Sequence, residues 1–208
     1  MDKPNLEIEY ELICGELQKI IKNIGEPLEG NCVYKHLSFD RWDYLDNKRK
    51  YYRKICLGKK RICEIGFNAG HSILAMLLIN PTAKYTLFDL GEHKYSRPCF
   101  EYLEQKFKDV NLSILWGDST ETFPNFICNN PEPFDLIHID GSDKSEVYTQ
   151  DWVNSMKVIT NGDHIIFDDT DNKKISAFID SQVTKGIVKE CYDFLPTFGY
   201  EHRILIKK

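Results

Sequence analysis

Residues 61–72 read RICEIGFNAGHS, a short apolar run that ends in two glycines four residues apart. The first part, Arg61–Ile65, has the length and the isoleucine content typical of a buried strand. Gly66 and Gly70 allow backbone to approach a ligand closely, and the start of a following helix would add unpaired N–H groups. The Gly-x-x-x-Gly spacing differs from the Gly-x-Gly-x-x-Gly spacing of dinucleotide-binding folds. The stretch therefore predicts a strand, a turn suited to a ligand, and a helix.

Short β-branched runs and helical stretches alternate after this point. Further strands are predicted at Tyr85–Phe88, Leu112–Leu115, Leu136–Ile139 and His164–Phe167, and helices at Ser72–Ile79, Pro98–Phe107, Ser119–Cys128, Glu146–Ile159 and Lys173–Gly186. Such alternation predicts right-handed βαβ units in a parallel sheet. Two late strands, Val188–Phe194 and Tyr200–Ile206, are too close for a crossover helix and should form an antiparallel hairpin. We expect an α/β fold with a Rossmann-like, doubly wound, seven-stranded and mostly parallel sheet that ends in this hairpin.

The first 58 residues have a different pattern. Apolar residues recur at helical spacing over Leu6–Ile24, and a second helix is predicted over Trp42–Leu57. We therefore expect an N-terminal helical cap over residues 1–58 and a ligand-binding domain over residues 59–208. An aromatic-rich stretch is interpreted either as a packed part of this cap, which we prefer, or as a lid over an acceptor pocket: Tyr34, His36, Phe39, Trp42 and Tyr44.

Composition narrows the classes of function. The chain has 208 residues and a formal net charge of −5, which argues against a broad nucleic-acid surface. Its one basic run, Asn47–Lys54, is interpreted as the solvated face of a helix in preference to an RNA-contacting strip. The seven cysteines form no CxxC pair, so we expect reduced packing residues. With no apolar run of about 20 residues, we expect a soluble, cytoplasmic protein with no membrane partner; a homodimer stays open.

Each of the five predicted parallel strands ends in an acidic residue: Glu64, Asp89, Asp118, Asp140 and the pair Asp168–Asp169. In an open sheet of this kind, ligands bind at the carboxyl ends of the strands, where the strand order reverses. Asp89 can accept both hydroxyls of a ribose, Asp118 can accept from an exocyclic amine, and Ser119 can cap the next helix. Several carboxylates in one cleft are costly unless they meet donors or a cation. A ligand with a ribose, an adenine amine and a cationic centre would meet that need.

At these residues the sequence resembles the class I S-adenosylmethionine-dependent methyltransferases, over about residues 60–208. The resemblance implies S-adenosylmethionine as cofactor. It places the methionine part on the glycine loop, the ribose on Asp89, and the adenine end on Asp118 and Ser119. The residues that it assigns to the loop site are Glu64, Gly66, Asn68, Gly70 and Ser72.

A narrower resemblance links residues 139–145, IDGSDKS, and the pair Asp168–Asp169 to metal-dependent small-molecule O-methyltransferases, including the sugar enzymes of antibiotic pathways. It implies that Asp140, Asp168 and Asp169 hold Mg2+, a hard cation that prefers carboxylate oxygens. Asp140 would thereby take part in catalysis, with Asp143 or Lys144 as the general base. The alternative for Asp168–Asp169 is a turn in which one carboxylate caps the following helix.

The leading hypothesis is a Mg2+-dependent O-methyltransferase that acts on a hydroxyl of a small molecule. The alternatives are a metal-independent methyltransferase for protein or RNA, an inactive nucleoside-binding module, and a nicotinamide dehydrogenase, which the glycine spacing disfavours. DNA and RNA bases are disfavoured as acceptors because the residues after the fourth strand are Asp-Gly-Ser-Asp. We expect His138, on a predicted strand, to pack in the core. His93 follows the predicted ribose-binding turn and could face the cofactor, but we prefer to interpret it as a histidine of a solvated loop.

Overall fold

The structure, a computed structural model, describes residues 3–34, 39, 45–130, 132–193 and 202–208. Two compact units emerge, and neither is continuous in sequence. The helical unit comprises Met1–Gly58, Phe67–Ala83 and Gly91–Leu112, and the sheet unit comprises Lys59–Gly66, Lys84–Leu90 and Ser113–Lys208. The chain passes from one unit to the other inside the glycine loop, between Gly66 and Phe67. The predicted domain boundary after residue 58 stays a prediction.

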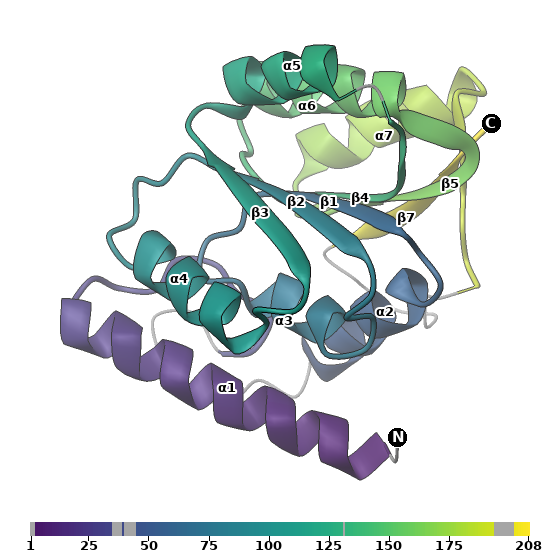
Figure 1. The fold of residues 1–208 in the computed structure, drawn as a ribbon. Coiled ribbons are helices and arrows are strands. Elements are labelled where there is room, and N and C mark those ends of the chain that lie inside the picture. Colours follow the sequence, from purple (N-terminus) through teal and green to yellow (C-terminus); the bar gives the residue numbers. More distant parts are fainter. Residues whose placement is uncertain (1–2, 35–38, 40–44, 131, 194–201) are drawn as a thin grey trace. The chain divides into compact units, whose positions relative to one another are not determined.

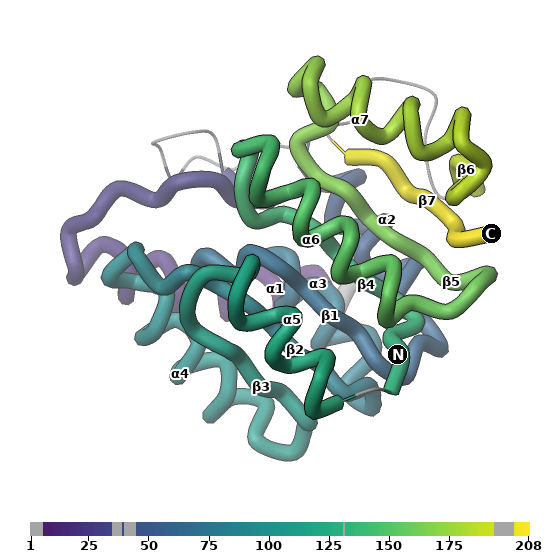
Figure 2. The backbone as a smooth tube through the Cα atoms, turned by 90° about the horizontal axis from the view of Figure 1, so that it is seen from above, coloured from purple at the N-terminus to yellow at the C-terminus, as the bar shows by residue number. Residues whose placement is uncertain are grey.

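Seven strands form one sheet in the order β3-β2-β1-β4-β5-β7-β6 (Figures 1 and 2). The strands are β1 (Arg61–Ile65), β2 (Lys84–Asp89), β3 (Asn111–Trp116), β4 (Phe134–Ile139), β5 (Ile159–Phe167), β6 (Val188–Glu190) and β7 (Arg203–Lys207). β1 pairs in parallel with β2 and β4, and β4 pairs in parallel with β5. β7 runs antiparallel to both β5 and β6. The predicted fold class, including the C-terminal hairpin, is confirmed.

Three helices cover one face of the sheet: α5 (Ser119–Asn129), α6 (Ser145–Val158) and α7 (Lys173–Thr184) (Figure 1). Their apolar residues meet the sheet in one core, in which Trp152 of α6 and Phe178 of α7 pack around Phe167 of β5. Burying each of these large side chains contributes about 2–3 kcal/mol. This core fixes the positions of β4 and β5, whose ends carry Asp140 and Asp168.

The helical unit contains α1 (Lys3–Ile24), α2 (Asp46–Cys56), α3 (His71–Leu77) and α4 (Ser96–Lys106). Among the described residues, no helix has the length and apolar character to cross a membrane. His93 lies in a loop, as predicted, but its side chain is only 21% exposed because it bonds Glu26 at 2.9 Å and stacks on Tyr95.

The basic run lies on α2, but two of its cations face the interior of the helical unit. Arg49 is 1% exposed, binds the Cys32 carbonyl and pairs with Asp46. Arg53 pairs with Glu7 and lies over the ring of Tyr10. These two arginines hold α2 against α1, so they are not available as part of an RNA-contacting strip. The predicted solvated face is therefore only partly correct.

Helix α6 buries a carboxylate in the sheet unit. Asp151 is fully buried, and neither carboxylate oxygen meets a well-aligned hydrogen-bond donor among the described residues. Burial raises the pKa of Asp151 to about 6, against the smaller lowering effect of the Ser119 hydroxyl. A buried carboxylate has a higher pKa in the folded state than in the unfolded state. At a pH above both values it is ionised in both states, and its burial then lowers the stability of the folded state.

We therefore expect Asp151→Asn to stabilise the protein at neutral pH by about 1–2 kcal/mol and to have much less effect near pH 4. The unfolded carboxylate ionises near its ordinary pKa, so the wild type loses stability as pH rises from about 4 to about 6. Urea unfolding of both proteins at the two pH values measures the difference. A stability difference that does not change with pH would contradict this interpretation.

Candidate functional site

The carboxyl ends of the five parallel strands lie in a row along one edge of the sheet. Backbone N–H groups join each end to the next: Gly117 to Asp89 O at 2.9 Å, Gly66 to Phe88 O at 2.8 Å, Asp140 to Ile65 O at 2.8 Å, and Asp168 to Ile139 O at 2.9 Å. These bonds continue the pairing of the sheet beyond the strands. The strand order reverses between β1 and β4, which is where open α/β sheets bind ligands.

Gly66 lets the ends of β1 and β4 come together. Its φ is 96°, a left-handed conformation that glycine adopts without strain. A Cβ built on Gly66 would lie 2.0 Å from the carbonyl oxygen of Asp140. No other residue fits between the two strand ends at this distance. The first predicted glycine of the loop is thus required by the sheet itself.

Asp89 is the last residue of β2, and Asp118 follows the end of β3 by two residues. Asp89 is half-buried, and Asp118 is exposed. Asp118 Oδ1 accepts from the backbone N–H of Thr120 at 2.8 Å and from its hydroxyl at 2.7 Å, which caps α5. These bonds, with the nearby charge of Lys144, hold the pKa of Asp118 below its usual range. The cap also fixes Ser119 at the start of α5. Roles for Asp89, Asp118 and Ser119 toward a cofactor stay predictions.

Four polar side chains gather where β1, β4 and β5 meet. His138 of β4 is fully buried, and its Nδ1 lies 2.9 Å from Oε1 of Glu64, which is also fully buried. Its Nε2 lies 3.4 Å from Oδ2 of Asp168 and 3.9 Å from Oδ2 of Asp140. Burial alone would lower the pKa of His138, but its bonds with Asp168 and Glu64 raise it to about 10. The neighbouring carboxylates therefore favour the protonated form of the imidazole.

This cluster differs from the predicted metal ligands in one member. His138, Asp140 and Asp168 each offer a ligand atom within 4.8 Å of the others. Asp169 does not belong to this group; it is exposed and has a φ of 54°. Such a conformation is uncommon for a non-glycine residue and clusters at functional sites. Sequence reasoning brought Asp140 and Asp168 together but placed His138 in the core. The role of Asp169 as a ligand stays a prediction.

The two predicted bases lie at the entrance to α6. Asp143 and Lys144 are both exposed, and Lys144 directly precedes the first residue of the helix. The Lys144 backbone N–H donates to the Ser142 hydroxyl at 3.2 Å. The charge of Lys144 also contributes to the lowered pKa of Asp118. Neither residue is distinguished as a base by these contacts, so both stay predictions.

The second half of the glycine loop belongs to the helical unit. The Asn68 side chain donates to the carbonyls of Glu29 and Gly30, so it ties the loop to the segment after α1. A Cβ on Gly70 would lie 2.6 Å from the ring of Phe67. Ser72 lies in the first turn of α3 and is 8% exposed. These contacts explain the loop's shape; a role in cofactor binding stays a prediction for all three residues.

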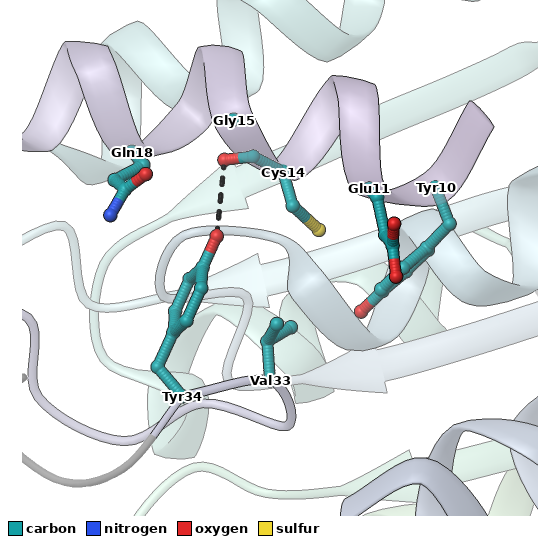
Figure 3. A pocket seen from close by; sticks show the side chains of 7 residues that line it. All are labelled: Tyr10, Glu11, Cys14, Gly15, Gln18, Val33 and Tyr34. Carbon is teal, nitrogen blue, oxygen red and sulfur yellow. Dashed lines mark hydrogen bonds between the residues drawn. The ribbon is translucent and has the colours of Figure 1, made fainter. Parts of the chain in front are cut away.

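A cavity of about 250 Å³ lies within the helical unit, between α1 and the segment that contains Val33 and Tyr34 (Figure 3). The Tyr34 hydroxyl donates to the Cys14 carbonyl at 3.5 Å, and its ring packs edge-on against Phe39 and His71. Tyr34 is thus part of the packed helical unit. The other proposed lid residues, His36, Trp42 and Tyr44, lie outside the described residues. Burial raises the pKa of the Cys14 thiol, so this cavity offers no thiolate nucleophile.

Solved structures of methyltransferases share this fold. An O-methyltransferase from Bacillus cereus in complex with S-adenosylhomocysteine has a TM-score of 0.69 and 16% identity, and the match covers 94% of this chain and 90% of that one. The TDP-rhamnose 3′-O-methyltransferase of calicheamicin biosynthesis has a TM-score of 0.65 and 16% identity, with coverage of 99% and 96%.

The methyltransferase MycE of the mycinamycin pathway, in complex with Mg and S-adenosylhomocysteine, has a TM-score of 0.57 and 14% identity, with coverage of 92% and 54%. At these identities the likeness concerns the fold alone. A search of curated protein sequences finds no match.

A family model described as a methyltransferase domain matches residues 63–170. This segment spans more than half of the chain and contains every acidic strand end described above, from Glu64 to Asp169. The resemblance to class I methyltransferases drawn from the sequence is thereby confirmed. The chain belongs to the methyltransferase-domain family.

Proposed function

We propose that this protein transfers the methyl group of S-adenosylmethionine to a hydroxyl oxygen of a small-molecule acceptor, with the assistance of a divalent cation. The row of acidic strand ends on either side of the switch point carries this proposal, because its carboxylates would meet the polar groups of such a cofactor. Complexes of similar structures with S-adenosylhomocysteine support the same cofactor here.

The polar side chains along the edge of the sheet would suit the parts of the cofactor in turn. The half-buried Asp89 would accept hydrogen bonds from the two ribose hydroxyls. Asp118 and Ser119 would bind the adenine amine. The close approach of β1 and β4 at Gly66 would let backbone line the methionine part. Asn68, Gly70 and Ser72 are further candidates for that part. Because the methyl group is already activated on sulfur, these residues mainly orient it and exclude water.

The acceptor side would lie at the ends of β4 and β5. Asp140 and Asp168, with Asp169 as a further candidate, would hold the divalent cation, for which Mg2+ is the ion implied by the sequence resemblance. When bound, such a cation lowers the pKa of a coordinated hydroxyl and fixes its orientation. Asp143 or Lys144 would accept the hydroxyl proton. The similar MycE structure is a complex with Mg, which supports a cation as part of the proposal.

The test is methyl transfer from radiolabelled S-adenosylmethionine to a panel of catechols, flavonoids and nucleotide sugars. We expect a hydroxyl acceptor to be labelled, and EDTA or Asp168→Asn to lower the rate by about 100-fold or more. Asp171→Asn is the matched control, because it removes an exposed carboxylate from the same loop, and it should keep the rate. Labelling of RNA or protein that survives both EDTA and Asp168→Asn would instead support a metal-independent enzyme and contradict the proposal.

A further inference from the structure

His138 has the contacts expected of a metal-binding histidine. It is paired in register with Glu64 on the neighbouring strand, and Glu64 Oε1 holds its Nδ1 at 2.9 Å. A carboxylate on one ring nitrogen fixes the orientation and the tautomer of an imidazole, and this is the usual environment of histidines that bind metals through the other nitrogen. The other nitrogen here, Nε2, faces two more carboxylates. A histidine packed for its apolar surface would need none of these groups.

The distances around Nε2 suit one cation. Nε2 lies 3.4 Å from Asp168 Oδ2 and 3.9 Å from Asp140 Oδ2, and all three ligand atoms fall within 4.8 Å of one another. Ligands at about 2.1 Å from a six-coordinate cation lie about 3 Å apart, and tetrahedral ligands somewhat further. Small side-chain rotations therefore bring the three atoms to bonding distance. His138 and Asp168 are buried, whereas the Asp140 side chain is 32% exposed and leaves the acceptor side open.

The carboxylates around His138 also favour a bound cation. Three carboxylates, from Glu64, Asp140 and Asp168, surround one imidazole at the junction of three strands. Two of these carboxylates, those of Glu64 and Asp168, are buried. Buried carboxylates are costly unless a cation or donors compensate them. A divalent cation at this junction would compensate the charges of the buried carboxylates.

From this geometry we infer that His138 Nε2, Asp140 and Asp168 form a three-ligand site for a divalent transition-metal cation of the Mn2+ and Co2+ class. Glu64 acts as a positioning residue that holds the imidazole. An imidazole nitrogen suits Mn2+, Co2+ or Zn2+ better than Mg2+, which prefers oxygen ligands and retained water. This inference rests on the proposed function and deepens it, because it names the class of cation and a nitrogen ligand that the carboxylates alone do not specify.

The test uses the full chain, stripped of metal and loaded with Mn2+. Pulsed electron paramagnetic resonance of bound Mn2+ detects a directly coordinated 14N nucleus, and growth with 15N-labelled histidine should convert that signal to the 15N pattern. Loss of the free Mn2+ signal on titration gives the stoichiometry and affinity. We expect one Mn2+ per chain and a preference for Mn2+ over Mg2+ of about 10-fold or more.

Two variants sharpen the test. His138→Gln should abolish the nitrogen signal and weaken Mn2+ binding by about 10-fold or more. Glu64→Gln should weaken Mn2+ binding by about 10-fold, because Glu64 holds the imidazole through Nδ1. His164→Gln is the matched control, because it removes a histidine from the adjacent strand that contacts Lys59, and it should keep the signal.

Bound Mn2+ with oxygen ligands alone, or no uptake of Mn2+, would overturn the inference. The isotope experiment uses the wild-type chain, so it decides the matter even where His138→Gln does not fold. The outcome is separable from the proposed function. Nitrogen-bound Mn2+ in a chain that labels no hydroxyl acceptor would sustain the site and refute the function. Methyl transfer to a hydroxyl by a chain whose metal has oxygen ligands alone would sustain the function and refute the site.

Discussion

Gly66→Ala is expected to destabilise the sheet unit by about 3 kcal/mol and to abolish cofactor binding. The added methyl group would lie 2.0 Å from the carbonyl oxygen and 2.5 Å from the carbonyl carbon of Asp140, both backbone atoms that cannot rotate away. The left-handed φ of 96° adds about 1–2 kcal/mol for any residue with a Cβ. The ends of β1 and β4 would have to separate, and the Ile65–Asp140 hydrogen bond would break.

The matched control is Gly162→Ala in β5. Gly162 has nearly the same backbone conformation, with a φ of 91°, but a Cβ there would meet nothing within 4 Å. Gly162→Ala therefore has the cost of the positive φ but no steric clash of the added methyl group. Chemical unfolding and calorimetry with S-adenosylhomocysteine should show a moderate loss of stability with intact binding for Gly162→Ala. Equal stability losses in the two variants would show that the contact with Asp140 is not what requires glycine at position 66.

Asp89→Ala has the largest expected effect on binding. The carboxylate would accept two ribose hydroxyls, and hydrogen bonds to a charged group contribute about 1.5 kcal/mol each. Their joint loss of about 3 kcal/mol corresponds to about 100-fold weaker binding of S-adenosylhomocysteine. The backbone at this point should not change, because the Asp89 carbonyl accepts from Gly117 N–H whatever the side chain.

Isothermal calorimetry measures this effect, with unfolding curves to establish that stability is kept. Asp109→Ala is the control, because it removes an exposed carboxylate from the turn before β3 and should leave the affinity unchanged. Asp89→Asn should fall between wild type and Asp89→Ala, since its amide has one acceptor oxygen. An unchanged dissociation constant for Asp89→Ala would remove Asp89 from the ribose site.

The sheet followed from the sequence because its strands carry strong local signals. Apolar runs ended by glycine or aspartate predicted all five parallel strands, and the short separation of the last two predicted their antiparallel pairing. The clearest error is in β5, which begins at Ile159 and not at His164. The Asn-Gly pair at 161–162 resembles a turn, but Gly162 takes a positive φ within the strand. The last predicted strand before the hairpin turn also proved shorter and ends at Glu190.

The site was harder to predict than the fold because its contacts join distant positions. Asp140 and Asp168 could be brought together from their places at the ends of neighbouring strands. His138 could not, because its partners Glu64 and Asp168 lie 74 and 30 residues away, and the apolar run around it indicates only that it is buried. The signal that could have revealed it is the register: Glu64 and His138 occupy matching positions, each shortly before the end of its strand.

The central claim is that the acidic ends of neighbouring parallel strands bind one molecule of S-adenosylmethionine. A crystal structure with S-adenosylhomocysteine tests it most directly. The account predicts ribose hydroxyls within hydrogen-bond distance of the Asp89 carboxylate, and the adenine amine beside Asp118 and Ser119. A ligand bound elsewhere, with Asp89 and Asp118 both out of contact with it, would contradict the account.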